Sequence, residues 1–319
     1  MFKWVENKFK SIVYTRADKK DYVFYFSGKD FEGLNVKPFS FNSSLGHKMQ
    51  GYFYYYNSFK PNRLIVFDHG MWSGHMGYMK EIEMLARHGY LVYSYDHTGC
   101  MESGGDFTNG FAQSLHDLDN CLSALEKLSE LKDYEISVMG HSWGGYSTMN
   151  ISALHPKIKH VVALSGFISV RAIINQSFSG FKRLFRGRIY ECEKKSNPSY
   201  VDFCAESTLA NTDVKALIIH SKDDKTVSYK HHFKRLLDTL DGKKNIRLLT
   251  VDKKGHNPNY TEEACKYKNQ YFSERQRLLK KGLLNTKEAQ EDFVAKFDWD
   301  KMTEQDPLIW EEIFEVLDN

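Results

Sequence analysis

Short apolar runs alternate with amphipathic stretches along most of the chain after residue 62. The apolar runs are residues 63–67, 90–95, 135–139, 160–164, 214–220 and 245–251. The amphipathic stretches, in which apolar residues recur at helical spacing, are 76–87, 111–131, 143–154 and 229–240. Near-continuous apolar runs are typical of strands that are buried on both faces. Their alternation with helices predicts an α/β fold, with a mostly parallel central sheet flanked by helices.

The first 60 residues show a different pattern. Aromatic and β-branched residues gather in three short runs, 22–26, 36–41 and 51–56, which Gly and Asn residues separate. This pattern is typical of antiparallel strands joined by hairpins. We therefore expect the chain to begin with β-structure.

Two stretches interrupt the alternation of strands and helices. Residues 168–212 contain helical patches without a convincing strand, and residues 260–304 are rich in Lys, Glu and Gln with scattered Leu and Phe. We expect both stretches to be helical insertions. Without them the remaining length suits one sheet domain, so we predict a single domain over residues 1–319.

Composition narrows the class of protein. The 44 Lys and Arg residues nearly balance the 41 Asp and Glu residues, and a net charge of +3 gives no argument for a nucleic-acid partner. Five scattered cysteines without a CxxC pair favour a reducing compartment over a disulfide framework. Neither a signal peptide nor a transmembrane segment is apparent, so we expect a cytoplasmic protein.

Chemistry is expected where the parallel strands end, because ligands bind at the carboxyl edge of such sheets. The run 135–139 leads into Gly-His-Ser-Trp-Gly at 140–144, a Gly-x-Ser-x-Gly motif. At this place Ser142 would sit on a sharp turn as a nucleophile, and the N–H of Trp143 would point at a developing oxyanion. The alternative is an ordinary serine that caps the following helix.

Two later strand ends supply partners for this serine. Asp224 and His256 each follow one of the last two apolar runs. A histidine can take and return the serine proton, and a carboxylate can hold the imidazole in the required tautomer. We favour Asp224 over its neighbour Asp223 because of its place in the loop.

The loop after the run 63–67 completes the candidate site. His69 and Gly70 would let the N–H of Met71 turn toward the oxyanion as a second donor. We expect His69 to be a hydrogen-bonded structural residue, and the same holds for His141 beside the nucleophile. No His, Cys, Asp or Glu group has the spacing of metal ligands, and no cofactor is implied.

Taken together, these residues resemble the α/β-hydrolase superfamily over about residues 35–258 and again at 307–317. The matching segments are Asp68-His-Gly-Met, Tyr95-Asp-His-Thr-Gly, Glu102-Ser-Gly-Gly, Gly140-His-Ser-Trp-Gly-Gly, Asp224 and Gly255-His256. The order serine, aspartate, histidine is that of the family's triad. The resemblance is strongest to small carboxylesterases, monoacylglycerol-lipase-like enzymes and serine aminopeptidase-like proteins. It implies that the loop at 96–99 buttresses the site and that residues 168–212 form a cap over it.

The resemblance also implies a function. We expect a serine hydrolase that cleaves a carboxylic ester of a small or medium acyl substrate through an acyl-enzyme. An aminopeptidase or amidase is the alternative within the fold, and it would need an acidic anchor such as Glu102 for the free amine of a short peptide. A non-catalytic binding protein is the alternative from a different class.

Cations on the expected cap allow two interpretations. The residues concerned are Arg171, Lys182, Arg183, Arg186 and Arg188. They are either the solvated face of an amphipathic segment or a surface that attracts an acidic substrate or a lipid layer. We favour the solvated face.

Overall fold

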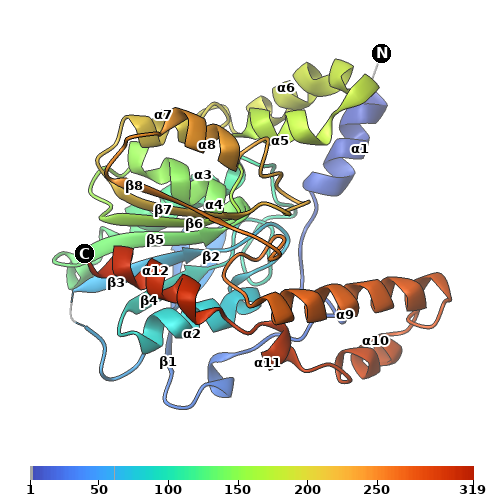
Figure 1. The fold of residues 1–319 in the computed structure, drawn as a ribbon, viewed down its shortest axis with the longest axis horizontal. Coiled ribbons are helices and arrows are strands. Elements are labelled where there is room, and N and C mark those ends of the chain that lie inside the picture. Colours follow the sequence, from blue (N-terminus) through green and yellow to red (C-terminus); the bar gives the residue numbers. More distant parts are fainter. Residues whose placement is uncertain (1–2, 61) are drawn as a thin grey trace.

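The computed structural model describes residues 3–60 and 62–319 (Figure 1). These residues form an eight-stranded sheet in the order β1-β2-β4-β3-β5-β6-β7-β8. The strands are β1 (Asn35–Asn42), β2 (Lys48–Tyr55), β3 (Arg63–Asp68), β4 (Leu91–Tyr95), β5 (Glu135–His141), β6 (His160–Leu164), β7 (Lys215–Ser221) and β8 (Ile246–Val251). Strands β3 to β8 run parallel, whereas β2 pairs antiparallel with β1 and β4. The α/β class and the mostly parallel sheet are therefore confirmed.

Helices cover both faces of the sheet, as Figure 1 shows. One face packs against α2 (Met79–Arg87) and α12 (Pro307–Asp318), and the other packs against α3 (Gln113–Leu125), α4 (Trp143–Asn150), α7 (Ala205–Ala210) and α8 (Phe233–Thr239). The sequence of strand β3 is apolar at successive positions because both of its faces are buried. Leu64 and Val66 lie in the core under α3 and α4, while Ile65 and Phe67 lie in the core under α2 and α12.

The beginning of the chain differs from the expectation of β-structure. Lys3–Val13 forms an α-helix, α1, whose buried residues Val5, Phe9 and Val13 recur every four positions. This spacing places the three side chains on one helix face, which packs into the main core. The expectation of a strand at 22–26 is also wrong, whereas the runs 36–41 and 51–56 lie largely within β1 and β2.

The aromatic run 22–26 pairs with no strand because its groups contact helices instead. The Phe24 ring lies 6.2 Å from that of Trp299 on α11 (Trp299–Met302), and the hydroxyl of Tyr271 donates to the carbonyl oxygen of Tyr22. Tyr271 belongs to α9 (Glu262–Lys280). The segment thus packs as an irregular strap under the C-terminal helices.

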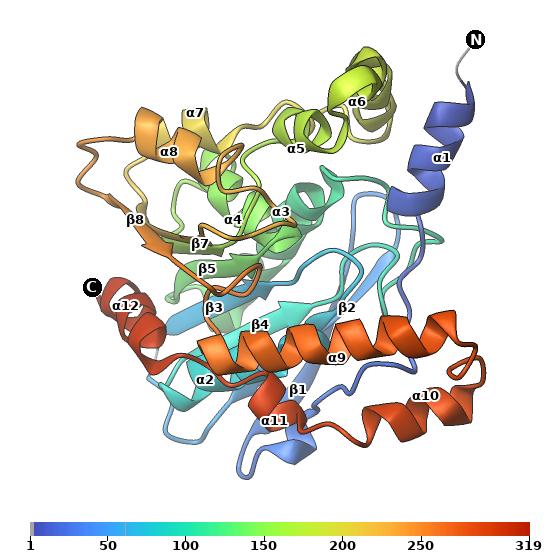
Figure 2. The ribbon, with the colours of Figure 1, turned by 45° about the vertical axis from the view of Figure 1, so that its right-hand side comes forward.

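Both expected insertions consist of helices in the structure. Residues 168–212 contain α5 (Val170–Ser177), a 3-10 helix η5 (Gly180–Phe185), α6 (Arg186–Ser196) and α7, and residues 260–304 contain α9, α10 (Lys287–Val294) and α11. Figures 1 and 2 place α1 beside α6, apart from α9 to α11. The single domain over residues 1–319 stays a prediction. None of the helices in residues 3–60 and 62–319 combines the length and the apolar run that crossing a bilayer requires.

Candidate active site

Ser142 occupies a strained turn between β5 and α4. Its backbone has φ 57° and ψ −108°, a left-handed conformation that a residue with a side chain rarely adopts. Glycines on both sides make the turn feasible. A Cβ on Gly140 would lie 2.4 Å from the carbonyl oxygen of Gly144, and one on Gly144 would lie 2.0 Å from that of Asp68. The motif therefore reflects close backbone approach, and Ser142 projects from the turn with partial solvent access.

The structure brings Ser142, His256 and Asp224 together. The Nε2 atom of His256 lies 2.9 Å from Ser142 Oγ, and its Nδ1 atom lies 2.7 Å from Asp224 Oδ2. With a proton on Nδ1, the imidazole donates to the carboxylate, and Nε2 is left to accept from the serine hydroxyl. The arrangement can carry a proton from the serine to the imidazole and stabilise the resulting imidazolium.

The Asp224 carboxylate is held from several directions. Its Oδ1 atom accepts the backbone N–H groups of Thr226 and Val227, at 2.8 and 3.0 Å. Burial acts to raise the pKa of Asp224, but hydrogen bonds from His220 and His256 outweigh burial and lower it well below its ordinary value. The side chain is therefore ionised at neutral pH.

Asp223, the alternative from the sequence, does not contact the imidazole of His256 but supports its loop. Its Oδ1 atom accepts the hydroxyl of Ser221 at 2.5 Å and the backbone N–H of Gly255 at 3.1 Å. The two neighbouring aspartates thus have different positions. Asp224 orients the imidazole of His256, and Asp223 orients the backbone that precedes it.

Met71 and Trp143 present backbone N–H groups near the nucleophile. Trp143 is the first residue of α4, directly after Ser142, and Met71 follows β3, which pairs with β5. Among the hydrogen bonds of the described residues, neither N–H group is a donor to a protein atom. Both N–H groups therefore stay candidates for the oxyanion donors expected from the sequence, and the N-terminus of α4, directly after Ser142, adds its positive dipole end.

A hydrogen-bonded chain that sequence reasoning missed connects the two sides of the site. The N–H of Gly70 donates to Tyr78 Oη (3.1 Å), Tyr78 Oη lies 2.7 Å from His141 Nδ1, and His141 Nε2 lies 2.6 Å from the carbonyl oxygen of His256. Burial lowers the pKa of His141 to about 3, so its ring is neutral and both nitrogens are used. The turn before Met71 is thereby coupled to the loop of His256.

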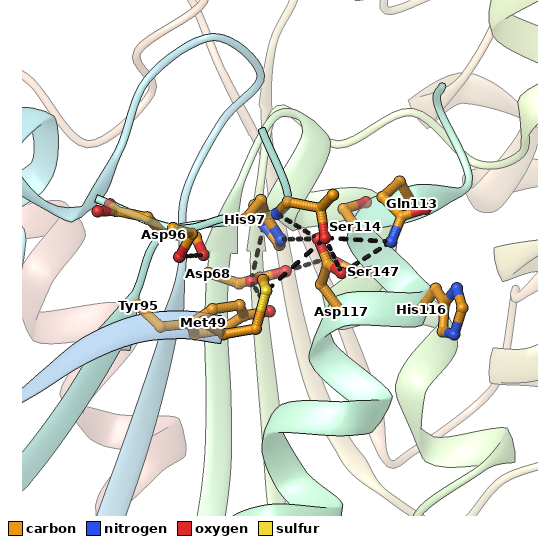
Figure 3. Close-up of polar contacts among 12 residues, drawn as sticks. Met49, Asp68, Tyr95, Asp96, His97, Gln113, Ser114, His116, Asp117 and Ser147 are labelled. Carbon is orange, nitrogen blue, oxygen red and sulfur yellow. Dashed lines mark hydrogen bonds and ion pairs between the residues drawn. The ribbon is translucent and has the colours of Figure 1, made fainter. Parts of the chain in front are cut away.

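A second missed feature is the buried charge on His97 (Figure 3). Its Nε2 atom lies 3.0 Å from Asp68 and its Nδ1 atom lies 3.3 Å from Asp117. Burial acts against a charged imidazole, but the two carboxylates outweigh it and raise the pKa of His97 to about 10. His97 is therefore a cation that ties the end of β3 to α3.

Asp68 connects His97 to the two segments that carry Met71 and Trp143. It also accepts the hydroxyl of Ser147, which lies on α4 one turn after Trp143, and it comes three residues before Met71. A single carboxylate thus joins the end of β3, which leads to Met71, to α4, which begins at Trp143. The resemblance pointed to the loop at 96–99 as a buttress, but no sequence pattern indicated which partners His97 would find.

Two cavities share Trp72, the residue that follows Met71. The cap pocket, about 530 Å³, lies between α1, α5 and η5 and is lined mainly by apolar groups, among them Phe9, Phe111 and Phe178. The lysine pocket, about 340 Å³, is lined by Met71 and His256 and by three lysines, Lys20, Lys80 and Lys268. Trp72 lines both cavities, and its φ of 58° lies in the left-handed region. The segment that carries Met71 thus stands between an apolar and a basic cavity.

No group of three or more His, Cys, Asp or Glu side chains within residues 3–60 and 62–319 is placed to hold a metal ion. His231 and His232 are neighbours in the sequence, and neither belongs to such a group. The ring of His232 is buried and contacts the N–H of Ile168 and the side-chain oxygen of Gln176. It is a structural histidine.

Comparisons with known proteins bear on the fold and on the class of protein. Residues 60–203, less than half of the chain, match the family described as serine aminopeptidase, S33. No curated protein matches the chain significantly. Among solved structures, an esterase from Pyrococcus furiosus superposes with a TM-score of 0.59 and 19% identity, over 83% of this chain and 98% of the esterase.

Two further solved structures have similar scores. An acylaminoacyl peptidase from Pyrococcus horikoshii has a TM-score of 0.54 and 19% identity, over 73% of this chain and 40% of the peptidase. Acetyl xylan esterase 1 from Thermoanaerobacterium sp. has a TM-score of 0.52 and 16% identity, over 79% of this chain and 93% of the esterase. The chain therefore has the α/β-hydrolase fold, as its sequence indicated, and the family match supports a hydrolase.

Proposed function

We propose that this protein is a serine hydrolase that cleaves carboxylic esters, with Ser142 as nucleophile, His256 as general base and acid, and Asp224 as the residue that orients His256. The observation that carries the proposal is the continuous contact from Asp224 through His256 to Ser142, with distances of 2.7 and 2.9 Å. The strained turn at Ser142 supports the same role because it exposes the hydroxyl at the sheet edge.

The reaction would proceed in two stages. His256 takes the hydroxyl proton as Ser142 Oγ attacks the ester carbonyl carbon, and the N–H groups of Met71 and Trp143 stabilise the oxyanion. His256 then gives the proton to the leaving alcohol as its C–O bond breaks. In the second stage His256 takes a proton from water, the water oxygen attacks the acyl-enzyme, and the acid leaves as Ser142 regains its proton.

The cap pocket supports an ester with an apolar acyl chain. Its volume of about 530 Å³ and its aromatic lining suit a small or medium chain. We propose that residues 168–212 act as the cap, because α5 and η5 form one wall of this pocket. Three basic residues of this segment contact other parts of the protein and not a ligand site. Arg171 lies over the Tyr190 ring, Arg186 donates to two backbone carbonyls, and Arg188 pairs with Glu6.

An aminopeptidase or amidase is the second candidate, because the matched family is named for serine aminopeptidases. Such an enzyme needs an acidic anchor for the free amine. Glu102, the candidate from the sequence, is exposed and accepts the hydroxyl of Tyr52 at 2.5 Å. Because an exposed carboxylate has acceptor sites for further donors, Glu102 stays a candidate anchor, and the relative turnover of an ester and an amide decides between the two substrates.

Turnover of matched substrates tests the proposal. We expect hydrolysis of a 4-nitrophenyl butyrate and much slower hydrolysis of an alanyl 4-nitroanilide. Ser142→Ala should lower ester turnover at least about 10³-fold, whereas Ser129→Ala, at an exposed serine, should leave it unchanged. Faster cleavage of the amide would favour the peptidase. Ester turnover that Ser142→Ala does not reduce would refute the assignment, and a folded protein without turnover would favour a binding protein.

A further inference from the structure

The lysine pocket has basic groups beside the proposed reaction centre. Lys268 of α9 donates from Nζ to the side-chain oxygen of Asn257 at 2.9 Å, and Asn257 directly follows His256. Lys20 donates from Nζ to the carbonyl oxygen of Trp72 at 3.1 Å, and Trp72 directly follows Met71. Each lysine thus contacts the neighbour of a site residue.

Within residues 3–60 and 62–319, neither of these two lysines forms an ion pair. Lys80, the third lysine, pairs with Asp300. Among the described residues that line the pocket, Glu81 is the one acid, and its carboxyl group accepts the side-chain N–H of Asn259 at 3.0 Å rather than pairing with either lysine. Burial lowers the pKa values of Lys20 and Lys268, as expected for ammonium groups withdrawn from water without a carboxylate in contact. A bound anion would compensate these charges.

A free donor lies in the same region. The indole Nε1 of Trp72 is buried and, among the described residues, has no hydrogen-bond partner. A buried donor without a partner costs free energy, and a ligand that brings an acceptor oxygen would remove this cost. Trp72 lines both cavities, so this donor is a feature of the segment between them and adds no separate argument for the lysine pocket.

The mechanism decides which part of an ester would occupy this pocket. His256 must give a proton to the leaving oxygen, so the leaving group has to lie on the side of His256. His256 lines the lysine pocket but not the cap pocket. The acyl chain would then extend past Trp72 into the apolar cap pocket.

We propose that the lysine pocket binds an anionic group, a carboxylate or a phosphate, on the leaving alcohol of the ester, and that Lys268 and Lys20 are its ligands. This inference rests on the proposed hydrolase function. Residues of α9 and of the segment between α1 and β1 would then determine which leaving group the enzyme accepts. The basic residues of 168–212 would have no part in this specificity.

Four phenyl butyrates that differ only in the para substituent provide the test. The substituents are carboxylate, phosphate, neutral carboxamide and ammoniomethyl, and release of the phenol is followed by absorbance. We expect kcat/KM for the carboxylate or phosphate ester to exceed that for the carboxamide ester by about tenfold or more, mainly through a lower KM. Comparison of the carboxylate ester with the phosphate ester shows which anionic group the pocket prefers. A preference for the ammonium ester would overturn the proposal and favour an amine site at Glu81.

A charge-removing variant links the preference to the pocket. Lys268→Met should lower kcat/KM for the anionic esters about 10- to 100-fold more than it lowers kcat/KM for the carboxamide ester, as for loss of a charge-assisted hydrogen bond. Lys266→Met is the matched control, because Lys266 lies on the same helix and is 66% exposed. An equal loss for all esters, or an equal effect of both variants, would overturn the proposal.

Binding without turnover separates this inference from the proposed function. Calorimetric titration of the Ser142→Ala protein with 4-hydroxybenzoate or 4-hydroxyphenyl phosphate should show binding that the additional change Lys268→Met weakens about tenfold or more. Equal binding to both proteins, or binding to neither, would overturn the anion site. Binding that depends on Lys268, together with an absence of ester hydrolysis by the unaltered protein, would refute only the hydrolase function.

Discussion

Glu193 of α6 offers a test of how residues 168–212 are held against the start of α4. Its carboxyl group is fully buried, accepts the N–H of Phe111 at 2.7 Å and accepts the hydroxyl of Tyr14 at 3.2 Å. The carbonyl oxygen of Phe111 in turn accepts the indole N–H of Trp143 at 2.6 Å. Burial raises the pKa of Glu193 to about 7 from its ordinary value of 4.5.

The change Glu193→Gln removes this ionisation while keeping the size of the side chain and an acceptor for Phe111. Because the folded-state pKa lies above the unfolded-state value, the unfolded chain loses this proton at a lower pH than the native protein does. The free energy of unfolding therefore falls as pH rises from about 4.5 to about 7. Each unit by which the folded-state pKa exceeds the unfolded-state pKa corresponds to about 1.4 kcal/mol. The whole loss in the free energy of unfolding is therefore about 3 kcal/mol. Between pH 5 and pH 8 it is roughly 2–3 kcal/mol.

Urea unfolding of both proteins at pH 5 and pH 8 measures this difference. The stability of Glu193→Gln relative to the unaltered protein should improve by roughly 2–3 kcal/mol at pH 8 compared with pH 5. The contributions of other titrating groups to the pH dependence of stability cancel, because both proteins contain these groups. A relative stability that stays constant within about 0.5 kcal/mol, or that moves in the opposite direction, would refute the reasoning.

Three further changes probe the supports of the site. Tyr78→Phe should lower kcat for a neutral ester about tenfold with KM nearly unchanged, because Tyr78 connects Gly70 to His141 and positions both loops; steady-state kinetics that show a change in KM alone would contradict this role. His97→Gln should cost about 3–5 kcal/mol in urea unfolding at pH 7, because it leaves Asp68 and Asp117 buried without their cation. Since the folded-state pKa of His97 is raised to about 10, the stability that it contributes is lost as pH rises toward 10, so the cost should shrink there, and a pH-independent cost would be the contrary result. Gly144→Ala should lower ester turnover at least about tenfold, because its Cβ would lie 2.0 Å from a backbone oxygen, while Gly187→Ala, which meets nothing within 4 Å, should leave turnover intact.

The parallel sheet could be predicted from the sequence because its strands are buried on both faces and leave a continuous apolar signal. The residues now found in contact, Ser142, Asp224 and His256, could be selected because each follows such a strand, and parallel strands bring their carboxyl ends to one edge. Local signals of this kind need no knowledge of distant partners.

The parts that could not be predicted depend on partners far away in the chain. Tyr22–Phe26 has the composition of a strand, yet packing against α9 and α11, about 250 residues later, decides its shape. The charge of His97 depends on Asp68 and Asp117, and nothing in the neighbouring sequence indicates that both would face it. The helix α1 did carry a local signal, since Val5, Phe9 and Val13 lie four residues apart.

The central claim is that His256 activates Ser142. The most direct measurement is covalent labelling by a fluorophosphonate, followed by peptide mapping in a mass spectrometer, because this probe reacts with an activated serine and not with an ordinary one. We predict a single adduct on Ser142 that His256→Ala slows at least about 10³-fold and that Ser129→Ala leaves unchanged. An unlabelled Ser142 in the folded protein, or labelling that does not depend on His256, would contradict the account.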